Sequence, residues 1–184
     1  MNKKLVAALS GGTALVLALS GCSDNSEVND YAKKVCDQLE PQLQKITDAN
    51  ESITSTAADG KPADIKKADS AAFQQISTAY ASMAGAVDKA GAPPVDDGEQ
   101  KQQAAVRGLN ATSRAYADLK ADVERLNTND QGKFASGLQD IAQKLDAVNK
   151  TGDDAIKNLQ SGEVGEAMSK QSGCKRPSEA SPSS

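Results

Sequence analysis

The sequence contains no histidine and no tryptophan, and aromatic residues make up only 3% of its 184 residues. Without histidine, the chain lacks the usual general base, the Ser-His-Asp arrangement and the commonest zinc and di-iron ligand sets. It also lacks a glycine-rich phosphate loop that follows a predicted strand. We therefore expect a protein that is not an enzyme and that carries no cofactor.

Carboxylates are the remaining groups that could carry chemistry, and they cluster at 96–99 and at Asp153-Asp154. A paired-acid glycosidase or a calcium site could use them, but helix N-termini and solvated faces explain them more simply. The segment 127–132 has glycine at the sixth position of a calcium loop, yet Leu138 stands where the twelfth-position Glu is needed. We expect no metal site.

A clustered basic surface is absent as well. The net charge is -4, and removal of residues 1–21, which hold two lysines and no acid, leaves 19 bases against 25 acids and a charge of -6. The lysines are interspersed with acids, whereas binding to phosphates needs a basic patch. The composition therefore excludes nucleic acid as a partner.

No apolar run is long enough for a spanning helix, which needs roughly 20 residues. The run at 5–19 is shorter and is interrupted by Gly11-Gly12-Thr13. It follows Lys3 and Lys4 and ends in Leu19-Ser20-Gly21-Cys22. A charged start, a short apolar stretch and small residues before a cysteine are typical of the lipobox of a bacterial lipoprotein signal peptide.

This pattern predicts cleavage between Gly21 and Cys22 and a thioether-linked diacylglycerol on the Cys22 thiol. Residues 1–21 are then the signal peptide, and 22–26 are the lipidated N-terminus and tether. Two or three acyl chains hold a protein on a bilayer, since each buried methylene contributes about 0.8 kcal/mol. We expect the mature chain at the extracytoplasmic face of the cell membrane, with the membrane as a partner through the lipid.

The rest of the chain is rich in alanine and carries apolar residues at alternating spacings of three and four in four segments. Each segment predicts a helix with one buried face. The connections fall at about 54–63, 91–98 and 127–130, which makes consecutive helices antiparallel neighbours. The sequence predicts an all-α fold, an antiparallel up-down-up-down four-helix bundle with a short C-terminal helix, over 27–174. The tail at 175–184 offers nothing to bury and is expected to be disordered.

Several residues indicate where these helices begin, end or bend. We expect Ser26 to cap the first helix, Gly91 to end the second, and Asn129 or Thr128 to cap the fourth. Pro41 lies within the first stripe and predicts either a kinked single helix or a brief break.

Two cysteines remain after Cys22, namely Cys36 and Cys174. In an oxidising compartment they are expected to form a disulfide. The topology agrees, because the fourth helix returns to the end where the first begins. A short helix at 162–170, with Val164 and Met168 facing inward, can then fold back toward Cys36.

Four features together resemble those of a known family. They are the lipobox, the alanine-rich helical pattern, the segment Tyr31-Ala32-Lys33-Lys34-Val35-Cys36, and the segment Gly162-Glu163-Val164-Gly165-Glu166-Ala167-Met168 followed by Cys174. The chain resembles the small secreted lipoproteins of actinobacteria, of the streptomycete type. That resemblance implies a location and a shape, and it implies no mechanism.

Two functions remain open. The first is a non-catalytic interaction module that binds a protein or cell-wall partner through the distal pole. We use this name for the loops that hold Asp59, Lys61, Asn127 and Asp130. Substitutions at these residues should weaken binding of the partner and leave stability nearly unchanged. The second is a small-molecule binding or sensing module with a pocket between the helices, lined by the inward tyrosines. Those tyrosines are more simply core residues whose hydroxyls reach the edge of the bundle. The inward tyrosines are Tyr31, Tyr80 and Tyr116.

Overall fold

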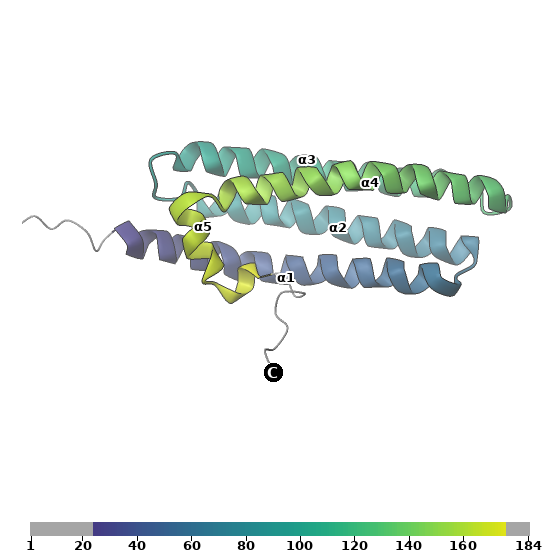
Figure 1. Cartoon of the computed structure of the whole chain (residues 1–184), viewed down its shortest axis with the longest axis horizontal. Coiled ribbons are helices and arrows are strands. Elements are labelled where there is room, and N and C mark those ends of the chain that lie inside the picture. The colour runs from purple at the N-terminus through teal and green to yellow at the C-terminus, as the bar shows by residue number, and fades with distance from the viewer. Residues whose placement is uncertain (1–23, 176–184) are drawn as a thin grey trace, which may run out of the picture.

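The computed structural model describes residues 24–175, and every regular element in this range is helical (Figure 1). The predicted all-α class is therefore confirmed. The predicted signal peptide, Cys22 and the tail from 176 lie outside the described residues. The elements are α1 (Asp24–Asp59), α2 (Pro62–Ala90), α3 (Gly98–Arg125), α4 (Gln131–Leu159), α5 (Gly162–Ser169) and a 3-10 turn, η1 (Ser172–Cys174).

The ends of α2 follow directly from its sequence. Pro62 occupies the first turn, where a missing backbone N–H leaves no hydrogen bond unmade. Gly91 ends the helix with φ +85°, a conformation that residues with a Cβ rarely adopt. The predicted end of the second helix at this glycine is confirmed.

Two predicted caps are wrong. Ser26 lies inside α1 and does not cap it, because the helix already begins at Asp24, within the stretch expected to be a tether. The cap of α4 is Asp130 rather than Asn129 or Thr128, since the Asp130 carboxylate accepts a hydrogen bond from the backbone N–H of Lys133 at 3.0 Å. A carboxylate at this position also interacts favourably with the helix dipole.

Helix α1 is longer than its apolar stripe indicates, because residues 54–59, expected to be a loop, are helical. This segment is rich in Ser and Thr, which usually favour turns. Here their hydroxyls bond back to carbonyls of the preceding turn, as Thr54 does to Asn50 at 3.0 Å. The helix also continues through Pro41, so of the two predicted alternatives the single helix is present and the brief break is wrong.

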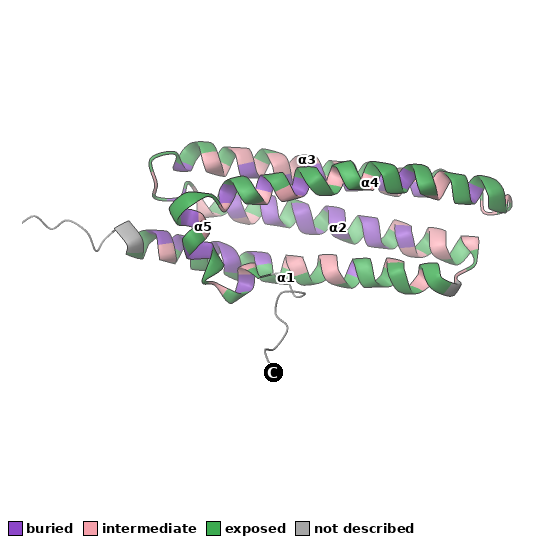
Figure 2. Ribbon diagram, in the orientation of Figure 1, coloured by how far each residue is buried: buried purple, intermediate pink, exposed green. Residues whose placement is uncertain are grey.

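The four long helices pack in sequence order, α1 on α2, α2 on α3 and α3 on α4, as an up-down-up-down arrangement requires. Figure 2 shows buried residues on the inward faces, most densely on α2, and exposed residues on the outward faces. The predicted bundle is confirmed. Fully buried apolar side chains at its centre include Val35, Ile76, Met83, Val87, Leu109 and Val123.

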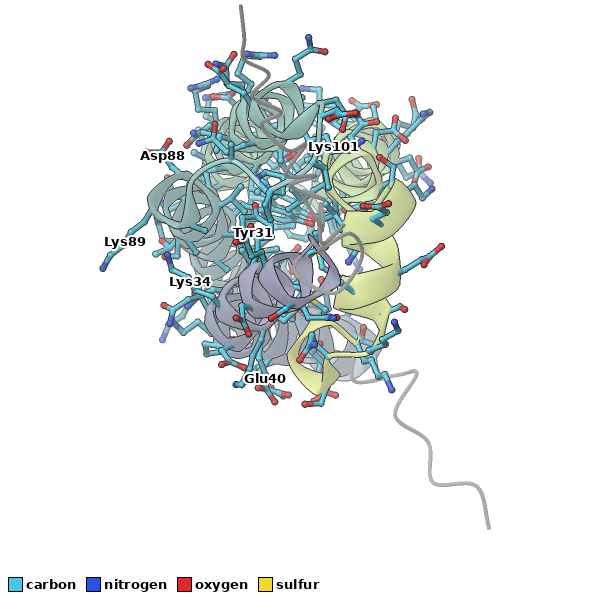
Figure 3. The ribbon with its side chains drawn as sticks, turned by 90° about the vertical axis from the view of Figure 1, so that its left-hand side faces the viewer. Tyr31, Lys34, Glu40, Asp88, Lys89 and Lys101 are labelled. Carbon is cyan, nitrogen blue, oxygen red and sulfur yellow. A yellow bond between two sulfur atoms is a disulfide. The ribbon has the colours of Figure 1, made fainter. Side chains whose placement is uncertain are left out.

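The fourth side of the bundle is open, because α1 and α4 have almost no direct contact. They are joined at one end only, where α5 and η1 pack against α1, as the end-on view shows (Figure 3). Val164 and Met168 are buried in this contact, as predicted. The Cys36–Cys174 disulfide, with a Cα–Cα distance of 4.9 Å, fixes it covalently and confirms the predicted pairing.

Candidate functional site

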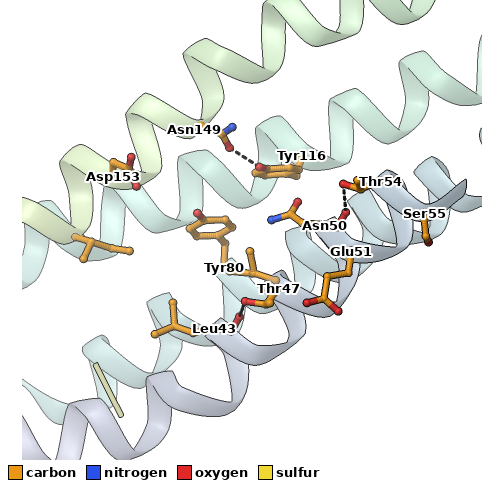
Figure 4. A pocket seen from close by; sticks show the side chains of 12 residues that line it. Leu43, Thr47, Asn50, Glu51, Thr54, Ser55, Tyr80, Tyr116, Asn149 and Asp153 are labelled. Carbon is orange, nitrogen blue, oxygen red and sulfur yellow. Dashed lines mark hydrogen bonds between the residues drawn. The ribbon is translucent and has the colours of Figure 1, made fainter. Parts of the chain in front are cut away.

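A cleft of about 680 Å³ lies in the open side of the bundle (Figure 4). Helices α1 and α4 form its walls, and tyrosines from α2 and α3 form its floor. We call it the α1–α4 cleft. Its lining residues are Leu43, Ile46, Thr47, Asn50, Glu51, Thr54, Ser55, Tyr80, Tyr116, Asn149, Asp153 and Ile156.

The floor is a pair of stacked aromatic rings. The ring centroids of Tyr80 and Tyr116 are 5.8 Å apart with an interplanar angle of 15°, and Phe73 packs against Tyr116 at 5.9 Å. The Tyr116 hydroxyl donates a 2.6 Å hydrogen bond to the Asn149 side-chain oxygen, which ties α3 to α4. Both tyrosines are thus buried core residues, and both also line the cleft.

Gly152 gives the floor its shape. A Cβ at this position would lie 3.0 Å from the Tyr80 hydroxyl and 3.2 Å from a methyl of Thr112. A glycine inside a helix costs about 1 kcal/mol relative to alanine. That cost is explained here by the close approach of Tyr80 to α4.

The charge of the lining has one sign. It includes the carboxylates of Glu51, on α1, and Asp153, on α4, and it includes no lysine or arginine. Burial raises the pKa of the Tyr116 hydroxyl above its usual range, and the neighbouring Tyr80 and Asp153 raise it further. The Tyr116 hydroxyl therefore remains a hydrogen-bond donor at neutral pH, beside a carboxylate.

The sequence interpretation of Asp153 was wrong. We placed Asp153-Asp154 together on a solvated face, but only Asp154 is exposed there, where it pairs with Lys150 at 2.6 Å. Asp153 is half-buried and lines the cleft. Neighbouring residues of a helix point about 100° apart, so an adjacent pair readily divides between two surfaces.

The α1 wall is apolar near the disulfide end and polar further along. Leu43 and Ile46 are half-buried, while the Thr47 hydroxyl donates to the Leu43 carbonyl at 3.1 Å and is satisfied within the helix. A smaller pocket of about 230 Å³ continues from the cleft toward Cys174. It shares Leu43, Asp153 and Ile156 with the cleft and adds Leu39, Met83, Lys157 and Gln160.

The residues predicted to form the distal pole do lie at one end of the bundle, at the two turns remote from α5 (Figure 1). Asp59 is the last residue of α1, and Lys61 precedes α2 and is exposed. The Asn127 side chain accepts a bond from the backbone N–H of Asn129 at 3.0 Å. Since the Asp130 side chain caps α4, its substitution is expected to lower stability rather than leave it unchanged.

Tyr31, the third inward tyrosine, does not line the cleft. It is buried near the α5 end, where it points between the helices while Lys34 and Lys89 point outward (Figure 3). Its hydroxyl has no hydrogen-bond partner among the described residues. Burial raises the pKa of Tyr31 to about 12.

The polar residues of the two walls were missed at the level of sequence. Asn50, Glu51 and Asn149 flank the apolar stripes of α1 and α4 and are exposed, as ordinary surface residues also are. The signal that could have found them is their position beside a stripe: Asn50 and Asn149 each directly follow a stripe residue, and Glu51 lies between Ala49 and Ile53. That signal becomes specific only once the two helices are known to stand apart.

Two further observations concern residues 24–175. This range contains no group of three or more Cys, Asp or Glu side chains placed to hold a metal ion. None of its helices combines the length and the apolar character that crossing a membrane requires.

No protein-family model, curated protein or solved structure shows a significant match to the chain. The interpretation of the cleft therefore depends on its own residues.

Proposed function

We propose that the protein is a membrane-anchored, extracytoplasmic binding protein that holds a small molecule in the α1–α4 cleft. The observation that carries this proposal is a cleft of about 680 Å³ between two helices that scarcely touch. Sites for small molecules are usually concave, about 300 to 1,000 Å³ in volume, and lined by apolar and aromatic side chains with a few polar groups. The stacked tyrosines, with Asn149 and Asp153 beside them, match that description.

The energetics of the open side support the same function. Leu43, Ile46 and Ile156 remain half-buried, although closure of α1 onto α4 would remove more apolar surface from water at about 25 cal/mol per Å². Exposed apolar surface rimmed by polar residues is typical of a binding site. A ligand that filled the cleft would cover these apolar side chains and so remove from water the surface that the helices leave exposed.

The proposed lipid anchor would place the α1–α4 cleft close to the membrane but facing the medium. If Cys22 carries lipid, α1 begins two residues later, at Asp24, so the α5 end of the bundle is held close to the bilayer. The cleft lies on the side of the bundle and stays open to the medium. Replacement of Cys22 with Ser should release the protein from the membrane fraction, and an unmodified N-terminus in the native membrane-bound protein would contradict the anchor.

Native mass spectrometry of protein purified gently from its membranes tests the binding function. We expect a bound small molecule on the native protein and its loss in Ile156→Trp, because the larger side chain fills the cleft. Leu138→Trp is the matched control, since Leu138 is also a half-buried residue of α4 but does not line the cleft. A bound molecule that both variants retain would contradict the assignment to this cleft.

A further inference from the structure

The α1–α4 cleft combines three features that together select a class of ligand, and the first is its charge. Asp153 lines the cleft from α4 and Glu51 lines it from α1, and no lining residue is basic. Lys150, the base nearest to Asp153 on the amino-terminal side, pairs with Asp154 on the outer face at 2.6 Å. Among the lining residues an anionic ligand would meet two carboxylates and no base, whereas a cation would meet side chains of the opposite charge.

The second feature is the aromatic floor beside Asp153. The Tyr80 and Tyr116 rings stack at 5.8 Å, and Asp153 acts electrostatically on the Tyr116 hydroxyl. Figure 4 shows Asp153 and Asn149 on the α4 wall, above these two rings. A carboxylate next to aromatic rings is the environment that favours an ammonium group, which gains both charge pairing and cation–π attraction.

The third feature is the apolar extension of the cleft. Leu43 and Ile156 line both the cleft and the smaller pocket, which continues past Leu39 and Met83 toward the disulfide. At about 230 Å³, this pocket has room for one slender apolar chain. Lys157 is the single base there; it is exposed at the rim, one helical turn after Asp153.

We propose that the ligand of the α1–α4 cleft is a single-chain amphiphilic organic cation. Its ammonium group lies between Asp153 and the tyrosine floor, and its apolar chain runs along Leu43 and Ile156 toward Met83. This inference rests on the proposed function and specifies its substrate class.

Isothermal titration calorimetry with three probes of equal chain length tests the proposal. The probes are decyltrimethylammonium, decyl maltoside and decyl sulfate, each below its micelle concentration, so that only the head group differs. We expect saturable binding of one decyltrimethylammonium per protein, about tenfold tighter than that of the maltoside. Decyl sulfate should bind more weakly than either.

Variants then locate the head group. Asp153→Asn should lower the affinity for decyltrimethylammonium about tenfold and leave the affinity for decyl maltoside unchanged. Lys157→Gln should raise the affinity for the cation. Asp154→Asn is the matched control and should change neither, because that carboxylate faces the outside of α4. Glu51→Gln is a second variant, at an exposed position where the substitution does not disturb folding. It should lower the affinity for the cation about threefold.

The possible failures separate the two proposals. If decyl maltoside or decyl sulfate binds as tightly as the cation, and Ile156→Trp abolishes that binding, the cleft is the site but the cationic class is wrong. An unchanged affinity in both Asp153→Asn and Glu51→Gln also overturns the class. If no probe binds saturably, the single-chain amphiphile class is wrong, and the native mass spectrum decides separately whether the cleft holds another small molecule. If a probe binds saturably and Ile156→Trp leaves that binding intact, the cleft is not the site and the proposed function is wrong.

Discussion

At the scale of single residues, Asp69 is a buried carboxyl whose environment affects the energy of folding. It lies on α2, is 7% exposed, and has one carboxylate oxygen with no hydrogen-bond partner among the described residues. Burial raises the pKa of the Asp69 carboxyl from its ordinary 3.8 to about 6. At pH values between these two pKa values, the folded protein therefore keeps the Asp69 proton, whereas the unfolded chain releases it.

That difference fixes the sign of a pH effect. Below pH 4 both states are protonated at Asp69 and the residue contributes no pH dependence. As the pH rises from about 4 to 6 the unfolded chain ionises first, so stability falls by about 2 to 3 kcal/mol and then stays level. We expect Asp69→Asn to remove this decline and to raise the free energy of unfolding at pH 7 by about 1 to 2 kcal/mol.

Urea unfolding at a series of pH values measures this effect. Asp64→Asn is the control, since Asp64 is exposed in the first turn of the same helix. If Asp69→Asn and the native protein give parallel curves between pH 4 and 6, the carboxyl is not buried as described.

At the scale of elements, the periodicity of apolar residues was sufficient to predict which segments are helical. Gly91 also marked the end of α2 well, because its backbone conformation is one that few other residues adopt, whereas the start of α2 at Pro62 fell inside the connection expected at about 54–63. The ends of α1 were missed, since hydroxyl residues such as Thr54 can satisfy themselves within a helix or in a turn. Local sequence does not decide between those two outcomes.

The start of α4 offers a test at this scale. Asp130→Ala should lower the free energy of unfolding by about 1 kcal/mol, because it removes the acceptor for the Lys133 backbone N–H and a favourable charge at the helix N-terminus. Asn129→Ala, one residue earlier and exposed, should change it by less than about 0.5 kcal/mol. Thermal unfolding followed by circular dichroism measures both. Equal effects of the two substitutions would show that Asp130 is not the cap.

At the scale of the whole molecule, the order of the helices followed from the short connections, but the open side did not. Leu43, Ile46 and Ile156 belong to the same regular stripes as fully buried residues such as Val35. A stripe indicates which face of a helix is apolar, and it does not indicate how many neighbours cover that face. The cleft, and with it the role of Asp153, therefore required the assembled structure.

The disulfide is the covalent link between the α5 segment and α1, and it was predictable because only one pair of cysteines remained. It closes a loop with a sequence separation of 138. Cys36→Ala with Cys174→Ala should lower the free energy of unfolding, by up to about 5 kcal/mol in the chain-entropy model. Urea unfolding of the oxidised protein, the reduced protein and the double variant measures this. The reduced protein and the variant should agree, and identical curves for all three would contradict a structural role for the disulfide.

The central claim is that binding takes place in the α1–α4 cleft and not at the distal pole, and photo-cross-linking in intact cells tests it most directly. A diazirine amino acid replaces Thr47, on the cleft wall, or Lys61, at the distal pole, and intact-mass analysis identifies what each captures. We predict that the probe at Thr47 captures an adduct with the mass of a small molecule and that the probe at Lys61 captures none. Capture of a protein at Lys61, with no adduct at Thr47, would contradict the account and assign the activity to the distal pole.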